Sequence, residues 1–223
     1  MIVVATHNGK DHLPVLLESL ERHGVGGHDV LILDTGSTCR ASLELLREVE
    51  SRKWPFRLEV GKTPYQAYDS GAYVHAFRNW DAEGYLFMQD SVKPKRDDWV
   101  SAFESKATYG VGCVPWLIFP MQWNSQEQVD WLISTCGVND WPPHGVFGPI
   151  FYAPRSAMES LDAKGFLDIL PSDKTQQMAM ERIWPTVFTL SGFAVRPVET
   201  VFDETLLRQD EYTHMTKKFA LRA

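Results

Sequence analysis

Residues 85–94 read Tyr85-Leu86-Phe87-Met88-Gln89-Asp90-Ser91-Val92-Lys93-Pro94, and the rest of the chain is organised around this stretch. Its first four residues form an apolar run typical of a buried strand, which ends on the carboxylate of Asp90 and a turn marked by Pro94. In open α/β sheets, ligands bind outside the carboxyl ends of the strands. The stretch therefore predicts a strand that delivers Asp90 to a functional site.

Two other apolar runs end in the same way. Ile2-Val3-Val4-Ala5 leads to Thr6, and Val30-Leu31-Ile32-Leu33 leads to Asp34. If these runs are parallel neighbours of the organising strand, Thr6 and Asp34 lie beside Asp90 at one edge of one sheet. We predict that this edge is the active site.

Helical patterns separate the apolar runs. Amphipathic or buried helices are expected over 11–22, 43–49, 65–80, 97–103, 154–165 and 173–184, the last ended by Pro185; further strands are expected over 56–60, 111–114, 147–153 and 193–198. The alternation of strands and helices predicts right-handed parallel crossovers and a doubly wound α/β sheet.

Residues 115–149 differ in composition from the rest of the chain. They hold four of the eight tryptophans together with five prolines. This segment is too apolar for a disordered linker and too interrupted for regular structure, so we interpret it as a folded lid or a binding-surface insertion.

The totals limit the possible partners and the compartment. With 22 basic and 29 acidic residues, the net charge is −7, which argues against broad binding to a nucleic-acid backbone or an anionic membrane. The three cysteines lack metal-ligand spacing and are expected to be reduced thiols. No apolar run approaches the roughly 20 residues of a membrane span, and no basic segment precedes the first apolar run. We expect a soluble, cytoplasmic protein.

The order of elements resembles the nucleotide-sugar glycosyltransferases of the GT-A fold, especially glycosyltransferase family 2. The resemblance rests on four stretches, residues 3–9, 31–38, 85–92 and 147–173. It implies a single domain with a mostly parallel, Rossmann-like sheet and helices on both faces. Its parts are a nucleotide-sugar-binding half over 1–114, an acceptor-side half over 115–200 with the insertion at 115–149, and a C-terminal tail over 201–223.

The resemblance also implies roles for individual residues. The implied donor-binding residues are Thr6, His7, Asn8, Asp34, Gln89, Asp90 and Lys217, with Asp34 on the nucleoside. Mn²⁺ or Mg²⁺ is the implied cofactor, with Asp90 and His214 as its ligands. Where the family has second acids, this chain has Thr35 and Ser91. One carboxylate can still suffice, because Mg²⁺ often takes only one or two from the protein.

Structural alternatives stand beside these roles. Asp34 is equally suited to an Asx-turn, and His214 with Lys217 to a basic helix end. The resemblance implies Asp173 as the catalytic base, although Asp173 followed by Gln176 also fits the N-cap of a capping box. Glu181, two turns further along, is the rival base or a solvated or ion-paired residue of the helix surface.

The expected function is therefore the transfer of a sugar from a UDP-sugar to a hydroxyl of a glycan, a protein or another acceptor. Inversion and divalent-metal assistance are implied by the resemblance. One alternative is a catalytically degenerate member that binds a nucleotide or glycan, which the replacement of two acids by Thr35 and Ser91 supports. Another is a glycosyltransferase acting on a modified base in nucleic acid. The net charge speaks against it, and the basic cluster of Lys217, Lys218 and Arg222 leaves it open.

Overall fold

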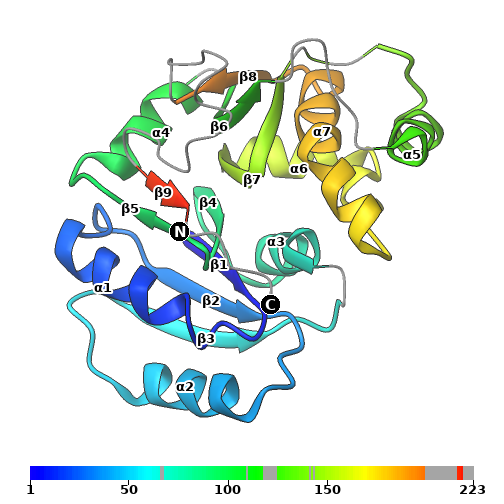
Figure 1. Ribbon diagram of the computed structural model, residues 1–223. Coiled ribbons are helices and arrows are strands. Elements are labelled where there is room, and N and C mark those ends of the chain that lie inside the picture. Colours follow the sequence, from blue (N-terminus) through cyan, green and yellow to red (C-terminus); the bar gives the residue numbers. More distant parts are fainter. Residues whose placement is uncertain are drawn as a thin grey trace.

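A mostly parallel sheet of seven strands, in the order β3-β2-β1-β4-β7-β6-β8, forms the centre of the molecule (Figure 1). The computed structural model describes residues 1–65, 68–108, 110–117, 125–140, 142, 144–198 and 215–217. The strands are β1 (Ile2–Thr6), β2 (Val30–Asp34), β3 (Leu58–Lys62), β4 (Gly84–Gln89), β5 (Val92–Pro94), β6 (Gly110–Leu117), β7 (His144–Pro154), β8 (Ala194–Pro197) and β9 (Met215–Lys217). Only β7 runs antiparallel to its neighbours in this sheet, β4 and β6, which confirms the predicted fold class.

Helices cover both faces of the sheet. They are α1 (Leu13–His23), α2 (Arg40–Ser51), α3 (Tyr68–Asn79), α4 (Trp99–Ala107), α5 (Gln126–Cys136), α6 (Arg155–Ala163) and α7 (Lys174–Leu190), with a 3₁₀ turn at Phe166–Asp168. Successive residues of β1 and β2 point to opposite faces, and both faces are buried. The side chains on one face pack with α1, α2 and α4, and those on the other face pack with α3, α6 and α7. This double burial explains why both strands are continuously apolar in sequence.

The three strands that carry the predicted site lie side by side. Strand β1 pairs in parallel with β2 and with β4, and the register places Thr6 opposite Asp34 and Ala5 opposite Gln89. Asp90 follows β4 directly, and its backbone N–H donates to the carbonyl of Ala5 at 3.1 Å. The prediction that Thr6, Asp34 and Asp90 share one edge of the sheet is confirmed.

Helix α7 extends past the proline that was expected to end it. Pro185 lies inside the helix, which continues to Leu190, so the predicted end at residue 184 is wrong. Proline removes one backbone donor from a helix. Burial of Trp184, Val187 and Phe188 in the core stabilises the following turn. No helix in the described part of the chain is long and apolar enough to cross a membrane.

The Trp/Pro-rich segment holds more regular structure than its sequence indicated. Strand β6 continues to Leu117, α5 spans Gln126–Cys136, and β7 begins at His144. Helix α5 ends on Gly137, whose positive φ of 68° suits a C-terminal cap. Leu132 of α5 is fully buried in the same core cluster as α7. The helix depends on this tertiary contact, which its weakly amphipathic sequence did not indicate.

Candidate functional site

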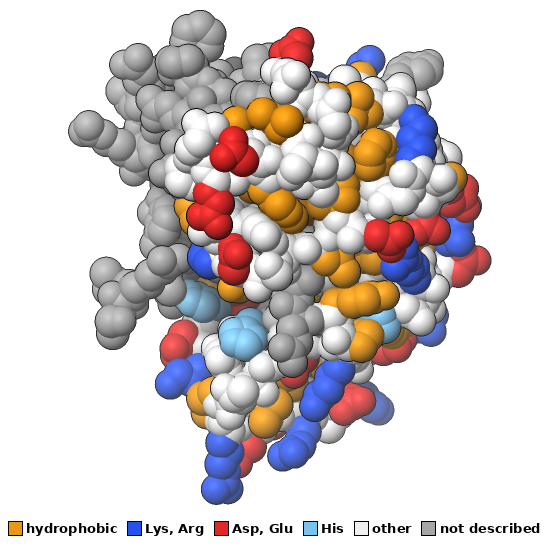
Figure 2. Space-filling view, turned by 90° about the vertical axis from the view of Figure 1, so that its right-hand side faces the viewer, with side chains coloured by type: hydrophobic (Ala, Val, Ile, Leu, Met, Phe, Trp, Pro, Cys, Tyr) orange, Lys and Arg blue, Asp and Glu red, His pale blue; other side chains and the backbone are white. Residues whose placement is uncertain are grey.

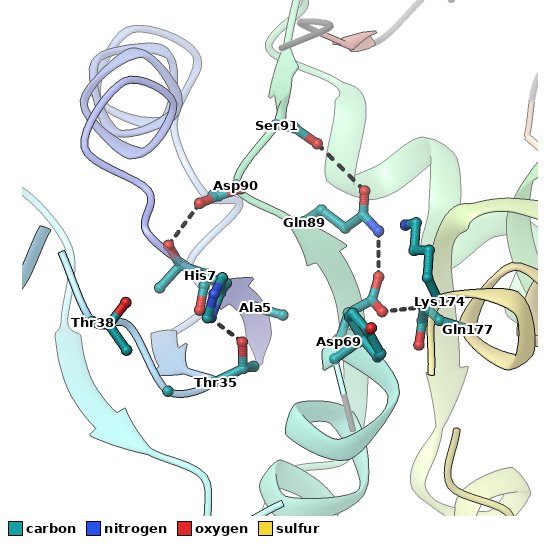
Figure 3. Close-up of a pocket in the computed structure, with 13 residues that line it drawn as sticks. Ala5, His7, Thr35, Thr38, Asp69, Gln89, Asp90, Ser91, Lys174 and Gln177 are labelled. Carbon is teal, nitrogen blue, oxygen red and sulfur yellow. Dashed lines mark hydrogen bonds between the residues drawn. The ribbon is translucent and has the colours of Figure 1, made fainter. Parts of the chain in front are cut away.

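A pocket of about 540 Å³ opens at the carboxyl edge of β1, β2 and β4 (Figure 3). Its lining comes from four regions: Ala5, Thr6 and His7 after β1; Thr35, Gly36 and Thr38 after β2; Gln89, Asp90 and Ser91 after β4; and Tyr68, Asp69, Lys174 and Gln177 from α3 and α7. Figure 2 views the molecule from the right-hand side of Figure 1 and shows histidine side chains near the middle of this face, with basic side chains projecting below them.

Asp90 lies in the pocket where the sequence predicted it. Its Oδ2 accepts the hydroxyl of Thr6 at 2.6 Å. Burial raises the pKa of the Asp90 carboxyl, and the Thr6 hydrogen bond and the nearby His12 and His7 oppose that rise. A cation at this carboxylate would stabilise its charged form in the same way.

The turn after β1 is packed closely against Asp90. A Cβ atom at Gly9 would lie 2.3 Å from the Thr6 Oγ1 and 2.4 Å from the Asp90 Oδ2. Any side chain at this position would therefore displace the hydrogen bond that orients Asp90. Glycine at position 9 is required by this close approach and not by a turn conformation.

Asp34 lies at the predicted edge, but it does not line the same pocket. It is 1% exposed, and its Oδ1 accepts the backbone N–H of Ser37 at 2.9 Å, which is the local turn bond that its sequence also indicated. It lines a second cavity of about 370 Å³ between α2, β2 and β3, together with Leu43, Leu46, Lys62 and others. A contact between Asp34 and a nucleoside stays a prediction.

The two residues after Thr6 have different positions. His7 is exposed and lines the pocket. Asn8 has a positive φ of 52°, and its Oδ1 accepts the backbone N–H groups of Thr38 and Cys39 at 3.0 and 2.9 Å. Asn8 therefore holds the chain at the entry of α2, a structural role that its prediction as a donor-binding residue did not include.

Asp69 and Gln177 are site residues that the sequence analysis missed. Asp69 is 7% exposed in the first turn of α3, and its carboxylate accepts the side-chain amides of Gln89 and Gln177 (Figure 3). The available signal was an acidic residue on a helix expected to pack beneath the central strand. The contact between Asp69 and Gln177 could be predicted only from the packing of α7 beside α3.

Lys174 and Tyr68 complete the lining and were also missed. The Lys174 Nζ lies 5.9 Å from the centre of the Tyr68 ring, within the range of a cation–π contact. Tyr68 has a positive φ of 50°, which is unusual for an aromatic residue, and it is 39% exposed. A strained, exposed aromatic residue beside a cation is typical of a ligand contact more than of a core position.

The two candidate bases occupy different places on α7. Asp173 is exposed at the N-cap, and its Oδ1 accepts the backbone N–H of Gln176 at 2.8 Å. Glu181 is half-buried, and its Oε1 accepts the backbone N–H of Gly148 at 3.1 Å. Neither lines the pocket itself, although Lys174, which follows Asp173, does. Both catalytic roles stay predictions.

The C-terminal candidates are only partly described. His214 lies outside the described residues. Lys217 belongs to β9, which pairs antiparallel with β5 so that Lys217 is opposite Val92, two residues after Asp90. This pairing brings the chain near residue 217 close to the end of the organising strand.

A metal ion would find one carboxylate in the pocket region around β4. Among the described residues there is no group of three or more His, Cys, Asp or Glu that could hold a metal. Asp90 nevertheless fits a cation that takes its other ligands from phosphate and water, because it lines the pocket at the end of β4. The predicted metal site is therefore reduced to Asp90 in the described part of the chain.

The three cysteines are free thiols with different environments, and we expect them to react at different rates. Backbone N–H groups of Ser42 and Ala41 lower the pKa of Cys39 at the start of α2, whereas burial raises the pKa of Cys113 strongly and that of Cys136 to about 11. At pH 7.5 more of Cys39 is therefore thiolate. Peptide mapping after brief iodoacetamide treatment should show Cys39 modified at least about tenfold faster than Cys136. Equal rates would contradict this assignment.

Comparison with known proteins establishes the fold. No protein-family model and no curated protein sequence matches this chain. Among solved structures, GalNAc-T7 with UDP, GalNAc and Mn²⁺ has a TM-score of 0.60 at 12% identity over 88% of this chain and 41% of that one. S. aureus TarS has a TM-score of 0.54 at 13% identity, over 98% of this chain and 36% of that one. The mannosyltransferase PcManGT from Pyrobaculum calidifontis, in complex with GDP-Man and Mn²⁺, has a TM-score of 0.51 at 17% identity, over 72% of this chain and 45% of that one. The fold is that of the GT-A nucleotide-sugar glycosyltransferases, and the chain spans less than half the length of each of these three proteins.

Proposed function

We propose that this chain transfers a sugar from a UDP-sugar to an acceptor hydroxyl, with inversion at the anomeric carbon and with a divalent cation. One observation carries the proposal: in a chain with a GT-A fold, the ends of β1, β2 and β4 line one pocket that also contains Asp90. The structure with a TM-score of 0.60 holds UDP and Mn²⁺, which supports the choice of nucleotide and metal.

Different parts of the pocket lining are suited to different groups of the ligand. His7, Thr35 and Thr38 offer an imidazole and two hydroxyls after β1 and β2, groups suited to a nucleoside diphosphate. Asp90, oriented by the Thr6 hydroxyl, would hold the cation, which supplies positive charge against the departing diphosphate. Asp173 directly precedes Lys174 of the pocket lining, and we assign it to the acceptor.

The reaction requires one bond to form as another breaks. The acceptor oxygen bonds to the anomeric carbon from the face opposite the diphosphate, and the bond between that carbon and the diphosphate oxygen breaks. The acceptor proton passes to the carboxylate of Asp173. The N-cap bond from the Gln176 N–H to the Asp173 Oδ1 holds this carboxylate in place at the start of α7.

Ligand binding tests the proposal directly. A ligand at about 100 times its Kd stabilises the folded state by about 2.7 kcal/mol, which for a domain of this size raises the melting temperature by roughly 5–10 °C. We expect this shift with UDP or a UDP-sugar in the presence of Mn²⁺, and a smaller one without it. GDP, GDP-mannose and Mn²⁺ alone are the comparison arms. A melting temperature unchanged by every nucleotide would contradict the proposal.

A catalytically degenerate binding protein is the second candidate. It is favoured by the single carboxylate that the β4 end contributes to the pocket. Release of UDP from the bound UDP-sugar distinguishes the two, because a binding protein shows the thermal shift without turnover. UDP release above that of heat-treated protein supports the transferase.

A further inference from the structure

A polar cluster joins three elements at one end of the pocket. Asp69 of α3, Gln89 at the end of β4 and Gln177 of α7 are brought together by the two amide hydrogen bonds to the Asp69 carboxylate. All three side chains line the pocket, on the side opposite Thr35 and Thr38 (Figure 3). We call these three residues the polar floor.

The carboxylate of Asp69 determines how both amides are turned. An ionised carboxylate only accepts hydrogen bonds, so each glutamine must present its NH₂ group to it. The amide oxygens then face away from Asp69. The Gln89 Oε1 accepts the Ser91 hydroxyl at 3.3 Å, whereas the Gln177 Oε1 is buried and has no hydrogen-bond partner among the described residues. Gln177 is 5% exposed, so this acceptor is also shielded from solvent.

A buried acceptor without a partner is unfavourable until a donor reaches it. The polar floor consists of one carboxylate and two amides, each of which already donates an N–H to that carboxylate, so most of what it offers to a ligand is hydrogen-bond acceptors. Neutral sugar hydroxyls donate to such groups. A sugar carboxylate only accepts, and its negative charge would face Asp69.

We infer that the polar floor binds the transferred sugar and selects a neutral sugar with free hydroxyls over a uronic acid. This inference rests on the proposed function and specifies its substrate class. Lys174 is the one cation in the described lining that could attract a sugar carboxylate instead. It is exposed and lies against the Tyr68 ring, at the α3 and α7 side of the pocket.

Titration calorimetry with Mn²⁺ and three ligands tests the inference: UDP, UDP-glucose and UDP-glucuronate, the last two differing only at C6. The wild type should bind UDP-glucose at least about tenfold more tightly than UDP-glucuronate. Asp69→Asn removes the charge at nearly constant shape. This variant should bind UDP with an affinity within about threefold of the wild type, and its affinity for UDP-glucose should fall by about tenfold or more. Its affinities for UDP-glucose and UDP-glucuronate should then lie within about threefold of each other.

Two further variants separate the contributions. Gln177→Met removes the buried acceptor at similar size and should weaken UDP-glucose without changing UDP. If the Asp69→Asn variant does not fold, Gln177→Met still tests whether the polar floor binds the sugar. Lys174→Met should leave the preference for glucose in place, because the polar floor and not the lysine sets it.

The contrary outcomes are distinct. Equal affinity of the wild type for UDP-glucose and UDP-glucuronate overturns the inference and leaves the proposed function standing. Equal weakening of UDP and UDP-glucose by Asp69→Asn and Gln177→Met makes the polar floor a structural support and also overturns it. If UDP does not bind at all, the inference and the assignment of a UDP-sugar both fail, and the GDP arms of the thermal series show whether the chain binds another nucleotide instead.

Discussion

Turnover of the Asp173→Asn variant is expected to fall by about a hundred- to ten-thousand-fold, the usual loss when a general base is removed. The substitution is clean in structural terms, because asparagine caps helices as well as aspartate does and can still accept the Gln176 N–H. Donor affinity and melting temperature should therefore stay near those of the wild type. UDP release under saturating donor measures the effect.

Glu181→Gln is the matched control for this prediction. The two sites are eight positions apart, which corresponds to about 12 Å along the helix, so both cannot occupy the same position beside the acceptor. A glutamine at 181 can still accept the Gly148 N–H through its Oε1 and should preserve the link between α7 and β7. We expect this variant to keep most of its turnover. If it is inactive and Asp173→Asn is active, Asp173 is a helix cap and Glu181 is the base.

Asp90→Asn is expected to abolish the gain in donor affinity that Mn²⁺ provides, so that donor affinity in the presence of Mn²⁺ falls by about tenfold or more. The carboxylate is the only acidic group that the β4 end contributes to the described pocket lining, and the amide of asparagine is a poor ligand for a hard cation by comparison. Calorimetry of the UDP-sugar with and without Mn²⁺ measures the loss. Binding without metal should change little.

The fold of the Asp90→Asn variant should remain intact. Asparagine can still accept the Thr6 hydroxyl, and it removes a charge whose burial is unfavourable. Asp140→Asn, at an exposed aspartate outside the pocket lining, is the matched control and should not alter either affinity. An unchanged Mn²⁺ effect in Asp90→Asn would remove Asp90 from the metal site.

The sequence by itself determined the sheet edge on which the site is built. Buried parallel strands are continuously apolar, so the first polar residue after each run marks a strand end. Thr6, Asp34 and Asp90 were located in this way, and the parallel register confirms their common edge. The capping of α7 by Asp173 followed from local spacing as well, because a capping bond joins residues three positions apart.

Only the tertiary structure decided which side chains share the pocket. Asp69 and Gln177 are 108 positions apart, and their contact exists because α3 and α7 pack on the same face of the sheet. A polar contact of this kind has no period in the sequence, unlike a strand or an amphipathic helix. The direction of a side chain at a strand end is likewise a tertiary property. Asp34 lies opposite Thr6 in the register but faces a different cavity, because its carboxylate is held by the turn that follows it.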